Sequence, residues 1–290
     1  MDSIRNRLIS AYGYDPGAYE GYVHQTQNEK VLLKLDWNVN ENNNLVLRYN
    51  LLNARRELPP HPFVLSFNST GRGPNENSLP FQNAGYRINN KLNSFALEVN
   101  SRYESFANRL FVSYNRFRDF REPFSKPFPT IEIGQAGVQL MTVGHEPFSI
   151  NNVLDQDVWQ FTNNISFYMG NHVFTAGVNY EKFSFYNSFN IFKYGLFLGF
   201  LPSSVFNPVF AHPDSFFVHT NPATPGAFYD FNGYVSGAQA VPFKGEDIKV
   251  SQLSFYVQDE YLVSEDFNLM YGVRVDIPMY TNPTANLFST

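Results

Sequence analysis

The 290 residues could fill one or two domains with a sizeable core; they carry a net charge of −5 and include no cysteine, which excludes disulfide frameworks and thiolate metal sites. Aromatic residues make up 17% of the chain and charged residues only 16%, against about 25% charged residues in an ordinary soluble domain, and the scattered basic residues argue against nucleic acid as a partner. No window approaches the run of about 18 apolar residues that a membrane-spanning helix needs, so contact with lipid would require a closed β-barrel.

The chain begins with MDSIRNRLIS, which lacks the apolar core of a signal peptide, and we expect an export signal outside this sequence. From there, alternation with a period of two residues predicts eight strands in four hairpins. They cover about residues 29–39 with 45–55, 91–103 with 109–120, 157–168 with 172–185, and 249–262 with 267–277. Short segments rich in Asn, Gly, Ser or Asp join the two strands of each hairpin, as turns require.

These strands have about 11 to 14 residues, whereas strands of soluble sheets usually have about 5 or 6. At about 3.3 Å per residue and a tilt near 45°, a strand of this length crosses roughly the 25 to 30 Å apolar band of an outer membrane. The fold class that we predict is therefore an all-β, antiparallel, up-and-down transmembrane β-barrel segment. Trp37, Trp159, Tyr114 and Tyr180 are candidates for aromatic girdles at the membrane interfaces.

Long segments separate the hairpins, at about residues 56–90, 121–156 and 186–248, and they are rich in Pro, Gly, Asn and aromatic residues. Unstructured connections of this length are rare inside a compact soluble domain, but short turns on one side and long loops on the other are typical of outer-membrane barrels. We expect the long loops to face the outside of the cell, and residues 1–27 and 279–290 to be parts of two further loops.

Each strand has an apolar and a polar face. In the first strand, Leu33, Leu35, Trp37 and Val39 alternate with Lys34, Asp36 and Asn38. Unpaired charges in a dry interior cost several kcal/mol each, so the polar face needs a wet lumen or mutual pairing. The candidate lumen-lining residues are Lys34, Asp36, Arg48, Glu98, Gln258, Glu260, Arg274 and Asp276. The same-face pairs Lys34 with Asp36 and Arg274 with Asp276 could line a permeation path, or simply belong to a solvated wall or contact a plug.

Two groups in the longest loop are candidate sites. Tyr194, Phe197 and Phe200 form an aromatic patch that could contact an apolar or glycan substrate outside the cell, or could pack against neighbouring loops. His212, Asp214 and His219 have metal-ligating side chains, but Pro213 and the lack of a fourth ligand favour solvated loop residues over a metal site. The sequence has no GxSxG, HExxH, P-loop or GxGxxG motif, so we predict neither a catalytic residue nor a cofactor site.

Three motifs resemble a known family. Residues 34–40 (KLDWNVN) with 45–50 (LVLRYN) resemble a barrel hairpin of Oar-like TonB-dependent outer-membrane receptors, and residues 12–17 (YGYDPG) resemble a loop motif of the same group. Residues 256–260 (YVQDE) followed by 269–276 (LMYGVRVD) resemble a hairpin found widely among TonB-dependent receptors. The resemblance extends over nearly the whole chain.

The resemblance implies a 22-stranded barrel, filled by an N-terminal plug, that moves a bulky substrate across the outer membrane with energy passed on by TonB. The sequence shows no plug domain, no TonB box and no final strand with a terminal aromatic residue, so residues 1–290 are expected to form a partial barrel domain of about eight strands. Its expected partners are outer-membrane lipid, the substrate and, through the missing plug and TonB box, the TonB complex. The alternatives are a complete small eight-stranded outer-membrane barrel and a secreted glycan-binding β-sandwich.

Overall fold

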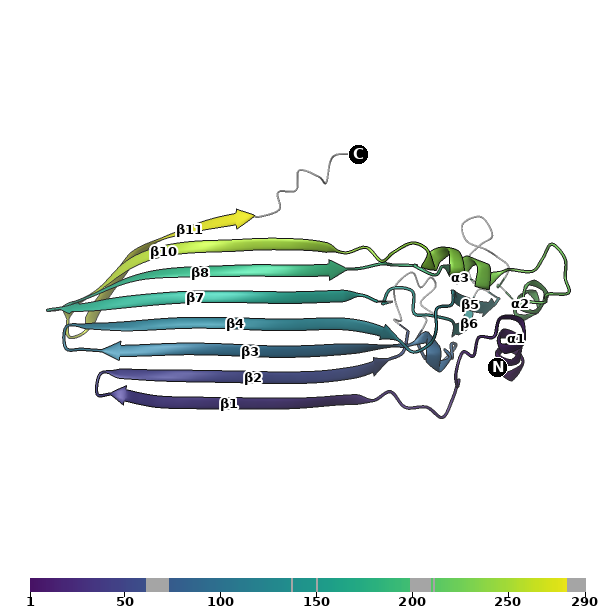
Figure 1. Cartoon of the computed structure of the whole chain (residues 1–290), viewed down its shortest axis with the longest axis horizontal. Coiled ribbons are helices and arrows are strands. Elements are labelled where there is room, and N and C mark those ends of the chain that lie inside the picture. The colour runs from purple at the N-terminus through teal and green to yellow at the C-terminus, as the bar shows by residue number, and fades with distance from the viewer. Residues whose placement is uncertain (61–72, 137, 150, 199–209, 211, 281–290) are drawn as a thin grey trace.

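Eight long strands form one antiparallel sheet in a computed structural model of the chain (Figure 1). The structure describes residues 1–60, 73–136, 138–149, 151–198, 210 and 212–280. The strands follow one another across the sheet in chain order: β1 (Thr26–Asn40), β2 (Asn43–Leu58), β3 (Tyr86–Arg102), β4 (Phe106–Pro123), β7 (Val153–Met169), β8 (His172–Ser188), β10 (Glu246–Ser264) and β11 (Phe267–Tyr280). The four predicted hairpins are therefore confirmed, and together with the meander order they give the up-and-down topology.

The strands are longer than the alternation predicted. They contain 14 to 19 residues, and β3 begins at Tyr86, whereas the apolar pattern suggested a start near residue 91. The extra residues, such as Arg87, Asn89 and Asn90, are polar on both faces, so alternation does not mark them although the backbone ladder continues. Strands of this length are about three times as long as those of a typical soluble sheet, which disfavours the sandwich alternative.

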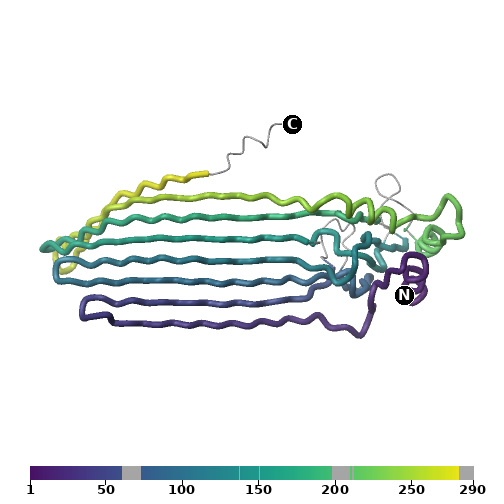
Figure 2. The backbone as a smooth tube through the Cα atoms, viewed as in Figure 1, coloured from purple at the N-terminus to yellow at the C-terminus, as the bar shows by residue number. Residues whose placement is uncertain are grey.

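The sheet is open. Among the described residues, β1 pairs only with β2 and β11 pairs only with β10, so the two strands form opposite edges. The tube in Figure 2 follows the same path from one edge to the other without closing. The described strands therefore form a curved segment of wall. A complete eight-stranded barrel would require pairing of the first and last strands, and the structure does not show this pairing among the described residues.

One face of the sheet is a continuous apolar surface. A single rung of laterally paired residues crosses all eight strands through Leu35, Leu47, Leu97, Val112, Phe161, Tyr180, Leu253 and Ile277. Side chains of this face are exposed, including Leu35 at 54% and Val273 at 68%. No protein core seals the apolar face among the described residues. Water is a poor solvent for such a surface, and lipid a good one.

Short turns join the strands at one end of the sheet, and the long connections gather at the other (Figures 1 and 2). At the first turn, the Asn40 side chain accepts a hydrogen bond from the backbone N–H of Asn42 at 3.0 Å, the turn-forming behaviour expected of Asn. Gly170, in the turn between β7 and β8, adopts a φ of +59°, which glycine tolerates without strain.

The long connections fold into a compact body that we call the loop cluster. Its elements are α1 (Asp2–Tyr12), η1 (Gln82–Ala84), β5 (Thr130–Gln135), β6 (Val138–Val143), β9 (Leu196–Leu198), α2 (Pro213–His219) and α3 (Phe231–Gln239). The three short strands form a second sheet in the order β6-β5-β9. The predicted long loops thus contain short helices and strands that alternation did not predict, because these segments bury an aromatic core against one another.

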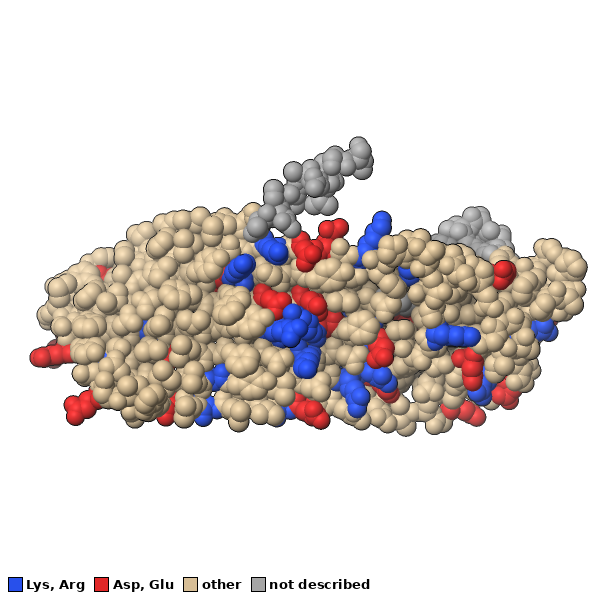
Figure 3. All heavy atoms as spheres, in the orientation of Figure 1, with Lys and Arg blue, Asp and Glu red and all other residues tan. Residues whose placement is uncertain are grey.

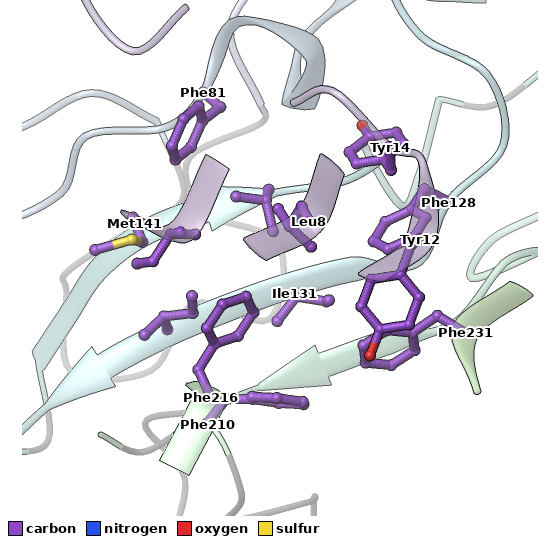
Figure 4. Packing of buried hydrophobic residues seen from close by; sticks show 13 residues of the cluster. Leu8, Tyr12, Tyr14, Phe81, Phe128, Ile131, Met141, Phe210, Phe216 and Phe231 are labelled. Carbon is purple, nitrogen blue, oxygen red and sulfur yellow. The ribbon is translucent and has the colours of Figure 1, made fainter. Parts of the chain in front are cut away.

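That core is drawn from distant parts of the chain. Leu8, Phe128, Ile131 and Phe216 are almost fully buried in one cluster (Figure 4), although they come from three separate segments of the chain. Helix α1 contributes through a four-residue spacing that places Ile4, Leu8 and Tyr12 on one face, and it ends at Gly13, whose left-handed φ of 61° allows the helix to stop. In the described part of the chain, no helix is both long enough and apolar enough to cross a membrane.

Candidate functional site

The polar face of the large sheet carries all eight residues predicted to line the lumen. Strand register places Asp36, Glu98 and Asp276 on one rung, which runs through Val46, Phe111, Thr162, Asn179 and Ser254. Lys34 of β1 and Arg48 of β2 lie opposite each other on the adjacent rung of the same face. Arg274 of β11 lies opposite Tyr256 of β10, on the next rung of this face toward the short turns. The side chains of Gln258 and Glu260 follow on the same face of β10, nearer the short turns. Sequence alternation thus predicted the shared face of residues as far apart as β1 and β11.

Glu98 lies at the centre of a charged group on β2, β3 and β4. Its carboxylate lies 3.3 Å from the Arg48 guanidinium and 3.1 Å from that of Arg109, and it accepts a hydrogen bond from the Asn100 amide at 3.0 Å. The Glu98 side chain is only 15% exposed, so these contacts replace lost hydration of the carboxylate. We call these four residues the Glu98 cluster.

A polar hollow of about 350 Å³ lies beside the Glu98 cluster. Arg48, Arg109, Phe111, Gln160, Thr162 and Asn164 line it. Two guanidinium groups and three uncharged polar side chains can offer hydrogen bonds to a polar or anionic group that enters from the polar face. Of these residues, sequence reasoning singled out only Arg48.

A second group of paired charges lies toward the other edge. Arg274 and Asp276 form an ion pair at 2.9 Å within β11, and Asp276 also accepts hydrogen bonds from Ser254 at 2.6 Å and Gln252 at 3.1 Å. Lys34 and Asp36 form the corresponding pair on β1, at 2.8 Å. The two same-face pairs identified in the sequence are therefore real ion pairs.

The Tyr256 side chain lies on the polar face, between the Glu98 cluster and the Arg274–Asp276 ion pair. It lies directly across from Gly177, where an added Cβ would approach the Tyr256 ring to 2.1 Å, and its hydroxyl donates a hydrogen bond to Asn164. The Arg274 guanidinium lies over the same ring, 5.4 Å from its centroid. One local signal points to this arrangement, because a glycine within an otherwise regular strand often marks the close approach of another group.

The aromatic patch predicted for substrate contact lies in the loop cluster. Tyr194 is 5% exposed and its ring meets His145 edge to face at a centroid distance of 5.6 Å. Phe197 lies on β9, pairs with Ile131 of β5 and packs against the buried core. Phe200 lies outside the described residues. Tyr194 and Phe197 thus pack against neighbouring segments, which was the alternative to substrate contact. Substrate contact by the three residues remains a prediction.

His145 is the buried titratable centre of the loop cluster. Its Nδ1 lies 3.1 Å from the Ser125 hydroxyl, which in turn lies 2.9 Å from the hydroxyl of buried Tyr14. Burial lowers the pKa of His145 to about 3, because the low-dielectric interior disfavours the charged imidazolium. Burial also raises the pKa of Tyr14 and of Tyr194. No local sequence pattern predicts the burial of this histidine.

The three candidate metal ligands do not converge. His212 caps α2, accepting a hydrogen bond from the backbone N–H of Asp214 at 3.2 Å, and the Asp214 carboxylate lies 3.4 Å from the same ring. His219 instead has its Nδ1 2.7 Å from the carbonyl oxygen of Ala227. Within the described residues, no three His, Cys, Asp or Glu side chains are placed to hold a metal ion.

Comparison with known proteins gives both a family and a fold. The family model for the outer membrane beta barrel domain matches residues 11–290. Among solved structures, the chain is similar to the outer membrane transporter YddB from Escherichia coli, with 11% sequence identity and a TM-score of 0.50, over 88% of this chain and 28% of that one. It also matches the ferric-catecholate import receptor Fiu from E. coli K12, with 12% identity and a TM-score of 0.48, over 87% of this chain and 34% of that one. None of the curated proteins matches the chain.

The chain thus spans about a third of the length of these two proteins. The likeness to YddB supports the same barrel-wall fold, and the family match agrees with the exposed apolar face and the long antiparallel strands. The family match places the protein in the outer membrane. Because the family model covers nearly all of its residues, the chain belongs to the outer membrane beta barrel domain family.

Proposed function

We propose that the chain forms part of the wall of a TonB-dependent outer-membrane transporter of the Oar-like kind, which moves a bulky substrate between the outside of the cell and the periplasm. In this proposal the apolar face contacts lipid, the polar face lines the lumen and the loop cluster lies outside the cell. The whole transporter would also contain a plug and a TonB box, through which it would receive energy from the TonB complex.

The observation that carries the proposal is the pairing of charges on the polar face. Three ion-paired groups, around Asp36, Glu98 and Asp276, lie on a single rung across eight strands. An eight-stranded barrel has an interior just wide enough for its side chains to fill, which would leave little room for such groups and their water. A wide lumen accommodates them, and a wide lumen suits a transporter of bulky substrates.

The motifs in β1, β2, β10 and β11 and the similarity to the outer membrane transporter YddB support the transporter class. They do not specify the substrate, so a siderophore, an oligosaccharide, a peptide and a protein are all consistent with the proposal. The polar hollow beside Arg48 and Arg109 favours a polar or anionic group at that position in the lumen. Neither a catalytic role nor a cofactor is part of the proposal.

Uptake measurements on whole cells test the transport function. The gene that encodes the chain is deleted in its native bacterium, and the uptake of labelled siderophores, oligosaccharides and peptides is compared with that of the parent strain, with and without an uncoupler of the proton-motive force. We expect the uptake of one substrate class to be lost in the deletion strain. We expect an equal loss of that uptake in the parent strain when the uncoupler is added. Uptake that depends on the gene but persists without a proton-motive force would contradict energy coupling through TonB.

A further inference from the structure

The two faces of the large sheet change character in opposite directions along the strands. On the apolar face, the rungs near the loop cluster carry charges, among them Arg118, which lies 2.8 Å from Asp157 and 3.5 Å from Asp155. Figure 3 shows, on the side of the molecule that it displays, charged atoms gathered over the loop-cluster half of the strands. On the polar face, that half of the strands instead carries apolar side chains.

These apolar side chains form a belt across the polar face. Its members share the face of Glu98, lie on β2, β3, β4, β8 and β10, and are Leu52, Leu92, Phe117, Phe183, Phe185 and Ile248. Leu92 lies directly opposite Phe117, and the rings of Phe183 and Phe185 lie 6.0 Å apart between centroids. Ile248 is 48% exposed and the other five are half-buried. The described residues thus leave an apolar belt open on an otherwise polar face.

A rung of uncharged polar side chains separates the belt from the polar hollow. Asn50, Ser94 and Asn115 lie on this rung, where the Ser94 hydroxyl donates a hydrogen bond to Asn115. Arg48 lies on the next rung toward the short turns, four residues from Leu52 on β2, which is about 13 Å at about 3.3 Å per residue. From the loop cluster toward the short turns, the polar face is therefore first apolar, then uncharged and polar, then charged.

The charged part of this face is basic in excess on β1 to β4. Two carboxylates and four basic side chains lie there, namely Asp36, Glu98, Lys34, Arg48, Arg102 and Arg109. Arg48 and Arg109 share the single carboxylate of Glu98, and the Arg109 side chain is 58% exposed, so it can take a further partner. Glu181 of β8 lies opposite Gln160 but does not line the polar hollow. The hollow therefore suits an anionic group.

We propose that the substrate of this lumen is an amphiphilic anion, in which a polar segment of about 13 Å joins an aliphatic or aromatic group to a carboxylate, phosphate or sulfate. The inference rests on the proposed transport function and names its substrate class. The apolar group lies on the belt, and the anionic group lies in the polar hollow. Burial of apolar surface favours the first contact, and charge-assisted hydrogen bonds from Arg48 and Arg109 favour the second.

A segment of the plug is the competing occupant of the belt. Two observations favour the substrate. The belt lies in the loop-cluster half of the strands, which a substrate from outside reaches first in the proposed orientation, and the apolar and basic parts lie in the order and at the spacing of the two ends of one molecule. A wholly hydrophilic substrate would leave the belt in contact with water, which is unfavourable.

Photo-crosslinking in outer-membrane vesicles that contain the full-length protein tests the site. The probe is N-dodecanoyl-tetraglycine with a diazirine on its acyl chain, because four extended residues place the terminal carboxylate about 13 Å from that chain. Crosslinked residues are identified by mass spectrometry. We expect labelling of the belt that unlabelled probe displaces, and about tenfold less labelling by the same probe with a terminal amide, which lacks the charge.

A belt variant and a matched control test the apolar contact. Leu92→Gln/Phe117→Gln makes the centre of the belt polar and should reduce labelling of Phe183 and Phe185 about tenfold. Leu262→Gln makes the same kind of change at an exposed apolar residue on the polar face of β10, near the short turns, and should keep the wild-type labelling. Heat-modifiable migration on gels confirms that each variant is folded.

A second pair of variants tests the charged contact. Arg109→Gln removes one guanidinium while Arg48 still neutralises Glu98, and it should reduce labelling of the belt about fivefold. Arg109→Lys keeps the charge and should retain most of the labelling.

Three results would overturn the inference: labelling confined to the apolar face, where the acyl chain enters lipid; no labelling of the belt, as expected if a plug covers it; or equal labelling by the acid and amide probes. Labelling needs no energy source, so it is separate from transport. Belt labelling without any gene-dependent uptake would contradict transport and leave the binding site in place. Gene-dependent uptake of a substrate that has no apolar group would overturn the inference and leave transport in place.

Discussion

The Arg109 guanidinium lies 3.1 Å from the Glu98 carboxylate, joining β3 and β4 through their polar face. Arg48 approaches the same carboxylate from β2 at 3.3 Å, so one largely buried acid holds two basic side chains. The Glu98 cluster therefore links three consecutive strands in addition to their backbone ladder.

Glu98→Gln should destabilise the barrel, because the amide cannot neutralise either guanidinium. Hydrogen bonds to charged groups contribute about 1.5–3 kcal/mol each, and the exposure of Arg109 reduces this, so we expect a loss of about 1–2 kcal/mol. Urea unfolding in detergent micelles, followed by tryptophan fluorescence, measures it. Glu104→Gln makes the same chemical change at an exposed turn and should stay within about 0.5 kcal/mol of wild type. Equal effects of the two variants would mean that the Glu98 cluster adds no stability.

Gly177→Ala should also destabilise the sheet, since the new methyl group collides with the Tyr256 ring. Overpacking of this kind costs about 1–3 kcal/mol. The penalty should largely vanish in a Tyr256→Ala background, which removes the obstacle. Gly237→Ala, in α3 with open space around it, is the control and should be neutral or slightly stabilising. An unchanged penalty in the Tyr256→Ala background would show that the ring is not the cause.

Acidification should loosen the loop cluster through His145. The folded-state pKa of His145, about 3, lies below its ordinary value, so between pH 6.5 and pH 3 only the unfolded cluster binds the proton. The contribution of neutral His145 to the stability of the loop cluster is therefore fully present above pH 6.5. It decreases as the pH falls, and at pH 5 it is smaller by about 2 kcal/mol. Hydrogen exchange of the β5 and β6 amides at several pH values, corrected for intrinsic rates, measures the change. His145→Gln should flatten this dependence, and a dependence that persists in the variant would assign it to another group.

Leu8→Ala should open the loop cluster and leave the large sheet intact. Leu8 is fully buried in the cluster core, and truncation of a buried leucine costs about 2–5 kcal/mol. Limited proteolysis should therefore cut the variant faster at α1 and the neighbouring connections, while heat-modifiable migration of the barrel is unchanged. Ile9→Ala, on the exposed side of the same helix, should be cut at the wild-type rate. Faster cleavage within the strands would contradict this separation of loop cluster and sheet.

The large sheet could be predicted because its signal is local and repeated. Each strand alternates with a period of two, so an odd or even position along the strand decides the face of a residue. This alternation alone predicts that Lys34, Glu98 and Asp276 lie on the polar face. Arg109 and Phe111 lie two residues apart on the polar face of β4. Because Phe111 is apolar, the alternation there is irregular and does not predict that Arg109 lies beside Glu98.

The loop cluster could not be predicted in the same way. Its core joins residues of three segments that lie far apart in the sequence and follow no common period, namely Leu8, Phe128 with Ile131, and Phe216. One local signal was present and missed, the spacing of Ile4, Leu8 and Tyr12 followed by Gly13, which marks a helix with a C-cap. The burial of His145 depends on contacts from other segments, so no local pattern reveals it.

The central claim is that lipid covers the apolar face and that the polar face borders the lumen. Because the chain has no cysteine, one nitroxide label can be attached at Phe161→Cys or at its neighbour Thr162→Cys, in protein reconstituted into bilayers. Electron paramagnetic resonance then compares relaxation by oxygen, which concentrates in lipid, with relaxation by a water-soluble nickel complex. We expect oxygen to dominate at position 161 and the nickel complex at position 162. A label at position 161 that is reached by the nickel complex, or shielded from both reagents, would contradict the claim.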